Sequence, residues 1–543
     1  MIFVIASVVI FFFFIAYQFL RKQFNRVVFF VAVAASFWIV CLPNSSWFNV
    51  TNPTIFILTF LKSFFLSLLD VGQLFVLNID FDKLSMNYHG WKAETFILFW
   101  IAFLYLMALL LSFSVIVQFL SNWWLTFKVK YIPCKINHIF FGDYSQFSLL
   151  IDDVAEKKER TIITYKNKLD IPTISNKIIQ IPLDYPLKLS DFNKTAKRTN
   201  YYLLDGEIES IKLAIDLIRD YGSSKSNDYL YINDPNSFLE DFLKKQQRDT
   251  EDFDDERLKV RFLNNERMAL YDFFYDNRHL LSKVINDTPH YVVIGDDQLA
   301  LECVALLSWL SQTFASNIRI SCIHSSEKFE TTLYYKMPAL FEQFQYESPI
   351  NFSFFKVPSL TSAAVYKELK SLSEPTAEFI FMDEVENIDL VRIIKQRMDK
   401  DFALIFSLVS PFLVKQYKAE YPNNILQLGS FSSSFNTELE MKALTLHKKY
   451  EQNFVERSFY NNQYNYYSSM SRALGDYYLN QINTDGETFP ESLIMQMEHN
   501  RWSVYLKTEG WRYDKHRDDV CKKHNLLVPF EDLSELEQNK DRN

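Results

Sequence analysis

The amino-acid sequence predicts an α-helical membrane domain, then an α/β region of two tandem doubly wound domains, and finally a small, mostly helical carboxy-terminal domain. Three observations support this fold class. The beginning of the chain is strongly apolar, short apolar strands then alternate with helical segments twice in the same order, and polar aromatic helices replace that pattern after Gly429. The predicted domain boundaries are 1–130, 135–285, 286–430, 431–485 and 486–543.

One stretch, Thr95–Gly142, joins the membrane domain to the α/β region. No charged residue lies between Glu94 and Lys128, and about 25 apolar residues at a rise of 1.5 Å per residue exceed a hydrocarbon core of ~30 Å. The tryptophan pair that follows, and the lysines after it, are typical of a cytoplasmic membrane interface. The segment KINHIFFG then has the pattern of a buried strand that opens a nucleotide-type fold.

Four apolar segments make up the membrane domain. We expect spans near 1–20, 27–42 and 96–121, and a re-entrant or spanning segment at 55–77. The basic link between the first two spans belongs in the cytoplasm, with the amino terminus outside, and a re-entrant third segment then gives the pore plan of tetrameric cation channels. The alternatives are a four-span bundle with a misplaced basic link, and a signal peptide at 1–20 that lacks a basic start and a cleavage site.

Asp70, Gly72 and Gln73 are the pore candidates, because they follow the expected pore helix where a selectivity filter would lie. An ionisable group at membrane depth is a functional hypothesis by default. The TVGYG motif of potassium filters is missing, so potassium selectivity does not follow. The alternative is that Asp70 packs between helices or lies at the membrane interface.

Charge and cysteine usage exclude several classes of protein. The formal net charge of −9 lies almost wholly in the polar part of the chain, which argues against nucleic-acid binding. The five cysteines show neither CxxC nor Cys/His spacing, so we expect neither a disulfide framework nor a metal site. An acidic run at 249–256 lacks the glycine of an EF-hand turn, and a solvated linker is expected there.

Two rounds of strands and helices form the α/β region. Short continuous apolar strands that alternate with helical stretches are the mark of a parallel, doubly wound sheet. The expected strands of the first round are INHIFFG, TIITY, KIIQIPL, NYYLLDG and DYLYIND, and those of the second are HYVVI, IRISCIH, FSFFKV, EFIFMD and ALIFSLV. The recurrence of the same order indicates two domains rather than one larger sheet.

The openings of the two rounds resemble a known family. HIFFGDYSQFSLLIDDV and HYVVIGDDQLALECVALL look like the starts of paired TrkA-N domains, the regulator-of-potassium-conductance (RCK) modules of cation channels and transporters. The resemblance covers roughly 135–429. It implies Rossmann-type domains that form a cytoplasmic gating ring.

The glycine loops depart from the nucleotide-binding pattern. A G-x-G-x-x-G fingerprint uses three glycines to admit a pyrophosphate, but only Gly142 and Gly295 remain of it. Asp143, Asp296 and Asp297 would repel an anion at the helix amino terminus. We interpret both loops as degenerate, with a structural and oligomeric role. Binding of NAD, or of another ligand or a cation at the acidic turns, is the alternative.

The last segment, 486–543, resembles the ryanodine-receptor (RyR) repeat domain. The matching motifs are Glu498-His499-Asn500-x-Trp502, Gly510-Trp511-x-Tyr513, the turn Arg517-Asp518-Asp519, and His524 with Leu527-Val528-Pro529-Phe530. Asp514 and Asn525 depart from the Gly and Pro that the family often has.

This second resemblance implies a ligand site. Aromatic faces stack on bases and guanidinium groups hold phosphates, and prokaryotic members of the family are regarded as candidate sensors of nucleotide derivatives. The expected site residues are Glu498, His499, Arg501, Trp502, Trp511, Arg512, Tyr513 and Arg517. The alternative is that the two tryptophans are the core of a small domain, with Glu498 and His499 hydrogen-bonded inside it.

Together these features predict a ligand-gated ion channel of the inner (plasma) membrane, multi-pass, with cytoplasmic soluble domains. Its partners would be the lipid bilayer, further copies of the chain in a homotetramer or other homo-oligomer, and a nucleotide-derived small molecule; no cofactor beyond that ligand and no nucleic acid is expected. The alternative is a membrane-disrupting effector of a bacterial nucleotide-signalling defence system. An NAD-dependent enzyme ranks third, because the glycine loops are not intact and no placed acid or base is found, so we expect no enzymatic activity.

Overall fold

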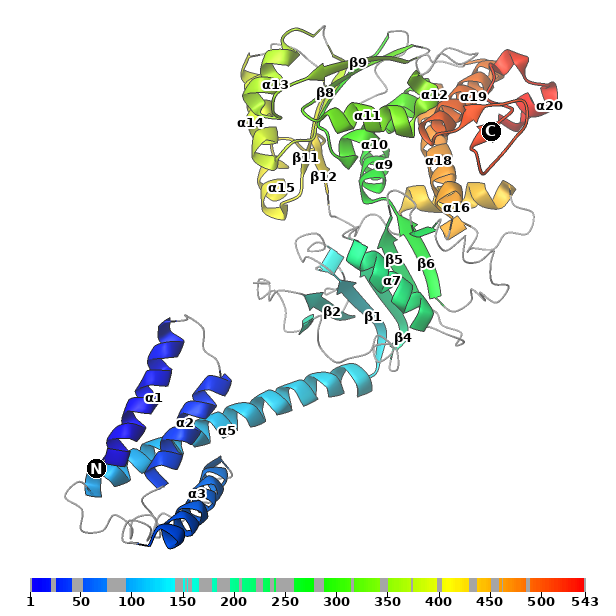
Figure 1. The fold of residues 1–543 in the computed structure, drawn as a ribbon. Coiled ribbons are helices and arrows are strands. Elements are labelled where there is room, and N and C mark those ends of the chain that lie inside the picture. Colours follow the sequence, from blue (N-terminus) through cyan, green and yellow to red (C-terminus); the bar gives the residue numbers. More distant parts are fainter. Residues whose placement is uncertain are drawn as a thin grey trace. The chain divides into compact units, whose positions relative to one another are not determined.

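The computed structural model divides the chain into two compact units, Met1–Ile132 and Pro133–Asn543, which are described separately (Figure 1). The described residues are 2–20, 26–41, 52–75, 94–141, 150–151, 154, 159–165, 178–182, 196–204, 208–220, 228–234, 239–240, 258–277, 288–313, 317–341, 350–372, 375–397, 403–428, 437–450, 459–460, 462–484 and 489–541.

The described part of the first unit is helical, with α1 (Ile2–Leu20), α2 (Arg26–Cys41), α3 (Pro53–Phe75) and α5 (Glu94–Tyr131). Helix α2 packs against the other three around an apolar core that includes Phe11 and Phe37. A short polar chain crosses this core: Trp100 Nε1 donates to Ser7 Oγ over 2.9 Å, and Ser7 Oγ donates to the Ser36 carbonyl oxygen over 2.7 Å. Such bonds are strong in apolar surroundings, so they fix α5 against α1 and α2.

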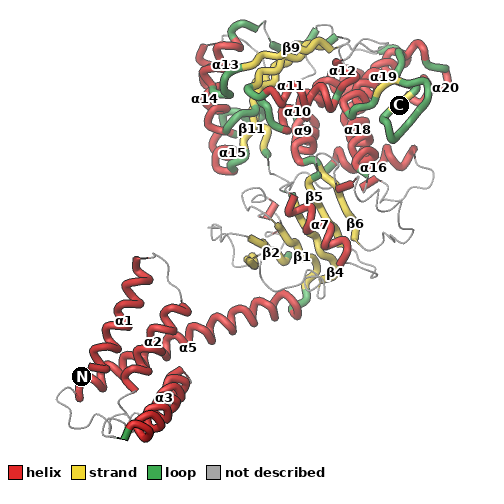
Figure 2. Tube along the Cα trace, in the orientation of Figure 1, coloured by secondary structure: helices red, strands yellow, loops and turns green. Residues whose placement is uncertain are grey.

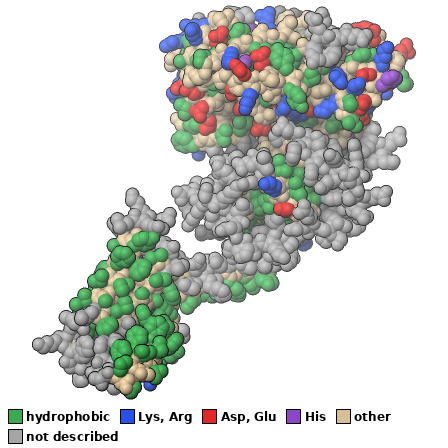
Figure 3. Space-filling model, viewed as in Figure 1, with side chains coloured by type: hydrophobic (Ala, Val, Ile, Leu, Met, Phe, Trp, Pro, Cys, Tyr) green, Lys and Arg blue, Asp and Glu red, His purple; other side chains and the backbone are tan. Residues whose placement is uncertain are grey.

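Two described helices are long and apolar enough to cross a membrane, α3 and the segment Glu94–Ser114 of α5, and two shorter apolar helices, Phe3–Tyr17 and Val28–Cys41, accompany them. Apolar side chains gather on the surface of these helices (Figure 3). Phe65 and Phe99, for example, are 67% and 69% exposed. Contiguous apolar surface of this kind marks contact with a membrane or a partner, in agreement with the predicted membrane domain.

The pore candidates lie in helical backbone. Asp70, Gly72 and Gln73 belong to the last turns of α3, which runs unbroken from Pro53 to Phe75. The prediction of an irregular filter after a short pore helix is therefore wrong at these residues. The segment contains one glycine, which costs only about 1 kcal/mol in a helix, and an apolar segment satisfies its backbone most easily as a helix. Their contact with a pore stays a prediction.

The first sheet has six parallel strands in the order β3–β2–β1–β4–β5–β6 (Figure 2). They are β1 (Cys134–Phe141), β2 (Arg160–Tyr165), β3 (Ile178–Pro182), β4 (Ala196–Leu203), β5 (Asp228–Asn233) and β6 (Leu258–Leu263), and α7 (Ile208–Asp220) packs on β4 and β5. This order, with the switch point between β1 and β4, is that of a doubly wound Rossmann fold. The prediction is confirmed, although the sequence pattern missed β6, whose Lys259 and Arg261 interrupt the apolar run.

The second sheet repeats the same order, β9–β8–β7–β10–β11–β12. Alternate side chains of β7 enter two cores: Tyr291 and Val293 pack with α10, and Val292 and Ile294 pack with α13 and α14. Helices thus cover both faces, as predicted. The elements are β7 (His290–Ile294), α10 (Gln298–Leu310), η4 (Ser311–Thr313), β8 (Ile318–His324), α11 (Glu327–Lys336), α12 (Pro338–Phe341), β9 (Ile350–Lys356), α13 (Ser362–Leu369), β10 (Ala377–Ile380), α14 (Glu384–Arg397), β11 (Ala403–Leu408), α15 (Pro411–Tyr417) and β12 (Ile425–Gln427).

The carboxy-terminal helices are built onto the α/β region rather than separate from it. Helix α16 packs along α18, α19 packs against α10, and α9, which follows β6, packs against both α10 and α18. Trp309 of α10 meets Tyr505 of α19 edge to face, with ring centroids 6.0 Å apart. The elements are α9 (Asn265–Asp276), α16 (Glu438–Tyr450), α18 (Gln463–Thr484), α19 (Glu491–Thr508), β13 (Arg512–Tyr513), β14 (Lys523–His524), η5 (Phe530–Asp532), α20 (Glu535–Gln538) and η6 (Asn539–Asp541).

In the second glycine loop, the side chains of Asp296 and Asp297 bond to nearby groups of the protein. Asp297 caps α10 by accepting the Ala300 N–H over 2.9 Å, and Asp296 accepts the Ser325 hydroxyl over 2.7 Å. Gly295 has a φ of +151°, and a Cβ there would lie 2.6 Å from the Phe381 carbonyl oxygen. These contacts support the structural interpretation of this loop. Gly142 and Asp143, and the acidic run at 249–256, lie outside the described residues.

Substitution Gly295→Ala should destabilise the soluble unit, because alanine cannot keep this backbone conformation and its Cβ would collide with backbone at Phe381. We expect a loss on the order of 1–3 kcal/mol, measured as a lower unfolding midpoint in denaturant. Gly72→Ala, where a Cβ would meet no atom within 4 Å, is the matched control and should leave that midpoint in place. Equal midpoints for both variants would contradict the described loop.

Candidate ligand-binding site

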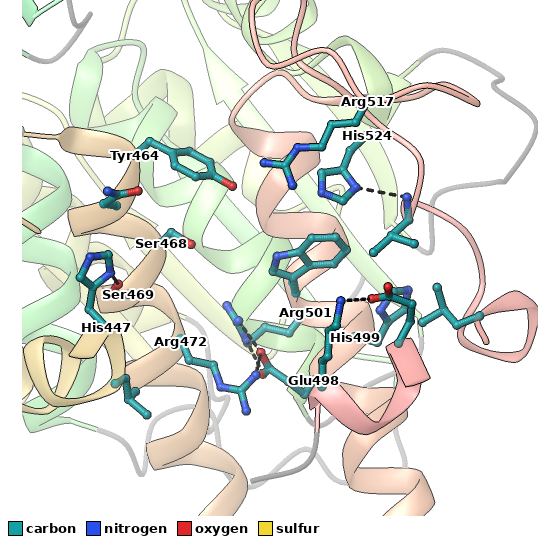
Figure 4. Close-up of a pocket in the computed structure, with 17 residues that line it drawn as sticks. His447, Tyr464, Ser468, Ser469, Arg472, Glu498, His499, Arg501, Arg517 and His524 are labelled. Atoms are coloured by element: carbon teal, nitrogen blue, oxygen red, sulfur yellow. Dashed lines mark hydrogen bonds and ion pairs between the residues drawn. The ribbon is translucent and has the colours of Figure 1, made fainter. Parts of the chain in front are cut away.

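A cavity of about 480 Å³ lies between the α16–α18 pair on one side and α19 with the carboxy-terminal loops on the other (Figure 4). Ligand sites of small molecules fall in this size range, roughly 300–1,000 Å³. Its lining is rich in cations, imidazoles and aromatic rings. The lining residues are Leu446, His447, Tyr464, Asn465, Ser468, Ser469, Arg472, Glu498, His499, Arg501, Trp502, Arg517, His524, Leu526, Leu533, Glu537 and Lys540.

Helix α18 presents a polar face to this cavity. Tyr464, Ser468 and Arg472 follow one another at four-residue spacing and all line it, because residues i and i+4 lie on the same face of a helix. The opposite face carries Tyr467 and Leu474, which are buried in the main core. The helix therefore separates the cavity from the core that both α/β domains share.

A buried ion cluster joins α18 to α19, and we call Arg472, Glu498 and Arg501 the buried triad. Glu498 is fully buried; Arg472 Nη1 lies 2.7 Å and Arg501 Nη2 2.6 Å from its Oε1, and Arg501 Nε donates to Oε2 over 2.7 Å. Arg472 also lies 2.8 Å from Asp476. Burial raises the pKa of Glu498, but the charges of Arg501 and Arg472 outweigh it and hold that pKa below its usual value.

The packing of Arg501 explains why α18 contains a glycine. A Cβ at Gly475 would lie 2.4 Å from Arg501 Cδ, so only glycine lets the two helices approach this closely. Arg501 is 1% exposed and lies over the Trp309 ring, 5.6 Å from its centroid. Arg501 thus connects the cavity wall to α10 of the second α/β domain.

Burial also raises the pKa of Asp476, to about 6, against the lowering charge of Arg472. This carboxylate is therefore ionised at neutral pH. Two arginines and two carboxylates then stand together, which leaves this end of the cavity close to neutral.

An aromatic cluster forms the opposite wall. The His524 ring meets Trp502 and Trp511 edge to face, with centroid distances of 5.2 Å and 5.9 Å. Tyr464 of α18 reaches the same cluster, 5.8 Å from Trp511. His499 Nε2 donates to the Val528 carbonyl oxygen over 2.8 Å, which ties the loop after β14 to α19.

Two cations at this rim, Arg517 and Lys540, are exposed and have carboxylate partners. Arg517 Nε donates to Asp519 Oδ1 over 2.7 Å, with both side chains more than half exposed. Lys540 lies 2.7 Å from Glu537. Exposed pairs of this kind contribute little to stability and exchange partners easily. Within the described parts of the chain, no group of three or more His, Cys, Asp and Glu side chains is placed to hold a metal ion.

The structure brings some of the predicted site residues together and leaves others outside. Glu498, His499, Arg501, Trp502 and Arg517 line the cavity. The other predicted residues do not: Trp511 is a buried ring behind the wall, and Arg512 and Tyr513 lie on β13, away from the lining.

The structure agrees with the core interpretation at several residues of the RyR-like segment, and ligand binding by the others stays a prediction. Trp511 belongs to the core, and Glu498 and His499 are hydrogen-bonded inside the domain, as the core interpretation expects. Trp502 is half-buried and lines the cavity, as the ligand-site interpretation expects.

Seven of the 17 lining residues lie outside the segment in which the site was predicted. Leu446, His447, Tyr464, Asn465, Ser468, Ser469 and Arg472 belong to α16 and α18, the region interpreted from sequence as a connector. The signal that could have found them is the spacing of Tyr464, Ser468, Arg472 and Asp476 along one face of a helix whose other face is aromatic.

Comparison with known proteins identifies one domain. The RyR domain family matches residues 480–543, which confirms the resemblance seen in the sequence. The matched segment begins inside α18 and includes α19 and the loops that close the cavity. No curated protein matches the chain.

Solved structures give weaker similarities. The GsuK channel bound to NAD has 9% identity and a TM-score of 0.37, covering 82% of this chain and 85% of its own. The structure titled GsuK Channel has 10% identity and a TM-score of 0.36, covering 82% and 100%. A dipicolinate synthase from Bacillus halodurans has 9% identity and a TM-score of 0.20, covering 66% and 99%. TM-scores in this range do not establish a common fold.

Substitution Glu498→Gln should destabilise the cavity strongly. Arg501, which is 1% exposed, would lose its charge partner without access to water, and breaking a buried pair in this way costs on the order of 3–5 kcal/mol. The readout is the denaturant midpoint of the purified full-length protein. Glu535→Gln, at an exposed carboxylate of α20, is the control. A Glu498→Gln midpoint equal to that of the control would contradict the described cluster.

Stability should also fall on acidification because of His524. Burial, with the nearby charge of Arg517 and against the raising effects of Asp519 and Glu537, lowers the pKa of His524 to about 4. A histidine whose folded-state pKa is depressed is protonated first in the unfolded chain, so its contribution is complete above about pH 6.5 and is lost as the pH falls toward 4. His524→Gln should flatten the decline in unfolding midpoint between pH 6.5 and 4, and exposed His516→Gln should not. Parallel pH profiles for both variants would count against this assignment.

Proposed function

We propose that the protein is a ligand-gated membrane ion channel whose soluble unit senses a nucleotide-derived molecule in the cavity between α18 and the RyR domain. The membrane unit would form the pore in a homo-oligomer, a tetramer by the pore plan that the sequence predicts. The soluble unit would face the cytoplasm. The observation that carries the proposal is that one helix, α18, contributes both to the cavity and to the junction of the two α/β domains.

The chemistry of the cavity supports a nucleotide-type ligand. Trp502, His499 and His524 offer ring faces and edges, and Arg517 and Lys540 offer positive charge at the rim. Stacking on a ring and charge-assisted bonds to phosphate are the two interactions by which proteins hold nucleotides. The RyR match at 480–543 supports the proposal, because the family resemblance implies such a ligand for this domain.

Tyr467 connects the cavity helix to the domain junction. Its hydroxyl oxygen accepts the backbone N–H of Asn264 over 2.6 Å, and Asn264 caps α9 at the point where the first sheet ends. The Asn264 side-chain amide donates to Glu302 of α10 over 2.9 Å. A shift of α18 on ligand binding would therefore act on β6, α9 and α10 together.

Helices α16 and α18 are also bonded to the first sheet, near the carboxyl ends of β5 and β6. Gln463, at the start of α18, donates its side-chain amide to the Asp234 carbonyl oxygen over 2.8 Å and its backbone N–H to Glu240 over 3.2 Å. Arg261 of β6 lies 3.5 Å from Glu440 of α16 and over the Tyr460 ring, 3.7 Å from its centroid. The α16–α18 pair is thus bonded to β5 and β6 through buried polar groups, which tolerate displacement poorly.

The first sheet is in turn linked covalently to the membrane unit. Helix α5 ends at Tyr131 and β1, the central strand of that sheet, begins at Cys134. Pro133 between them cannot continue the helix. A movement of β1 would reach α5 through two residues, so a ligand that binds one arrangement of the soluble unit more tightly would shift the population of open pores.

A pore of low selectivity, opened by the same ligand, is the second candidate. The observation that favours it is the helical backbone of Asp70, Gly72 and Gln73, which are the residues predicted to form a filter. Such a pore would make the protein a membrane-disrupting effector in a nucleotide-signalling defence system. Strong discrimination between cations in a flux assay would exclude this candidate.

The proposal predicts ligand-dependent ion flux through liposomes that contain the purified protein. Among adenosine, AMP, ADP and NAD, at least one compound should raise flux. Trp502→Ala should raise the concentration of that compound needed for half-maximal flux about fivefold or more, because stacking on one ring is worth about 1–3 kcal/mol. Exposed Tyr335→Ala, at an aromatic residue that is 86% exposed on α11, is the control. The proposal would be contradicted if none of the four compounds changed the flux, or if Trp502→Ala responded to them as the wild type does.

A further inference from the structure

The two ends of the cavity differ in how much of their hydrogen-bonding capacity is already used. In the buried triad, Arg501 directs Nε and Nη2 to Glu498 and Nη1 to Ser471 Oγ over 3.3 Å, and Arg472 directs its guanidinium to Glu498 and Asp476. These arginines are paired with carboxylates of which Glu498 is fully buried and Asp476 is 18% exposed. A ligand phosphate would have to replace a buried carboxylate to bind them, which is costly.

The other end, which we call the open end, consists of Tyr464, Arg517 and His524, all of which line the cavity. Figure 4 shows the Tyr464 hydroxyl directed toward Arg517, with His524 beside that guanidinium. The three side chains come from α18, the β13–β14 loop and β14. The Trp511 ring packs against both Tyr464 and His524, with centroid distances of 5.8 Å and 5.9 Å.

His524 presents a defined donor at the open end. The Leu526 backbone N–H donates to His524 Nδ1 over 3.1 Å, so Nδ1 is the acceptor and the neutral ring carries its proton on Nε2. The residue is 5% exposed, and among the described residues nothing accepts a hydrogen bond from Nε2. A nine-tenths buried donor without a partner, at the wall of a cavity, points to a ligand acceptor.

Arg517 and Tyr464 add charge and a second donor. Arg517 donates its Nε–H to Asp519, whose side chain is 65% exposed. Its Nη1 and Nη2 groups are then left to donate to a ligand. The Tyr464 hydroxyl makes no hydrogen bond to any described residue. Three donors around one point, one of them cationic, match the acceptor oxygens of a phosphate group.

We infer that the open end is the phosphate subsite of the cavity: Arg517, His524 Nε2 and the Tyr464 hydroxyl hold a phosphate of the ligand, while Arg472 and Arg501 are positioning residues that shape the opposite wall. This inference rests on the proposed nucleotide-type ligand and assigns its orientation, with the anionic group away from the buried triad. The sequence-based expectation named Arg501, Arg512 or Arg517 as the cation that contacts the ligand, and this inference selects Arg517.

Binding of ADP, adenosine and pyrophosphate to the purified full-length protein tests the inference by calorimetry. Arg517→Gln and His524→Gln should each weaken ADP and pyrophosphate on the order of tenfold or more, since a hydrogen bond to a charged group is worth about 1.5–3 kcal/mol. Tyr464→Phe should weaken them less, and adenosine should bind all three variants as it binds the wild type. Arg512→Gln, Tyr513→Phe and His516→Gln are the matched controls, since none of these residues lines the cavity.

Each outcome decides the question. If Trp502→Ala abolishes ADP binding while Arg517→Gln and His524→Gln leave it unchanged, the cavity binds the nucleotide and the phosphate subsite is wrong. If none of the three compounds binds the wild type, the proposal of a phosphate subsite and the proposal of a nucleotide-type ligand are both wrong. Arg517 is about half exposed, so its Gln variant remains a valid test if His524→Gln fails to fold.

Discussion

The ion pairs of Glu498 with Arg472 and Arg501 hold α18 and α19 together at the bottom of the cavity. Glu498 and Arg501, which are 0% and 1% exposed, are tolerated in the interior because each charge has a partner at 2.6–2.7 Å. The close approach of Arg501 to α18 in turn requires glycine at position 475, and its guanidinium lies over Trp309 of the second α/β domain. This cluster therefore contacts the cavity, the RyR domain and the α/β region at once.

This constraint assigns different roles to residues of the same type. Arg472, Arg501 and Arg517 all line the cavity, but only Arg517 has a partner that is itself exposed. A ligand anion can compete with an exposed carboxylate at little cost, whereas displacing a buried one leaves an unpaired charge. The buried triad thus determines the shape of the cavity, and the open end selects the charge of the ligand group that binds there.

The sequence predicted the fold better than the site. Strands such as HYVVI and IRISCIH are continuous apolar runs, so buried parallel strands could be predicted from the sequence. Both sheets have the doubly wound order that these strands indicated. Strand β6 was missed because Lys259 and Arg261 alternate with its apolar residues. The expected helix end before Asp70 was wrong because one glycine and one carboxylate do not break an apolar helix of this length, and the role of Asp70, Gly72 and Gln73 in a pore stays a prediction.

The sequence-based site prediction, made from the RyR motifs, contained five of the 17 lining residues. Glu498, His499, Arg501, Trp502 and Arg517 were found because they belong to motifs, but their partners on α18 belong to none. Arg472 meets Glu498 across 26 positions of the chain, and Tyr467 meets Asn264 across 203. Contacts at such separations depend on tertiary packing, which neither periodicity nor motif spacing encodes.

The central claim is that a ligand in the cavity acts on the pore through the first sheet and the short link from β1 to α5. Insertion of three glycines between Tyr131 and Cys134 tests it most directly, with nucleotide binding and liposome flux measured on the same preparation. The account predicts that binding stays at the wild-type affinity while the ligand no longer changes the flux, because a flexible link transmits no displacement. A flux response that survives the insertion would contradict the account.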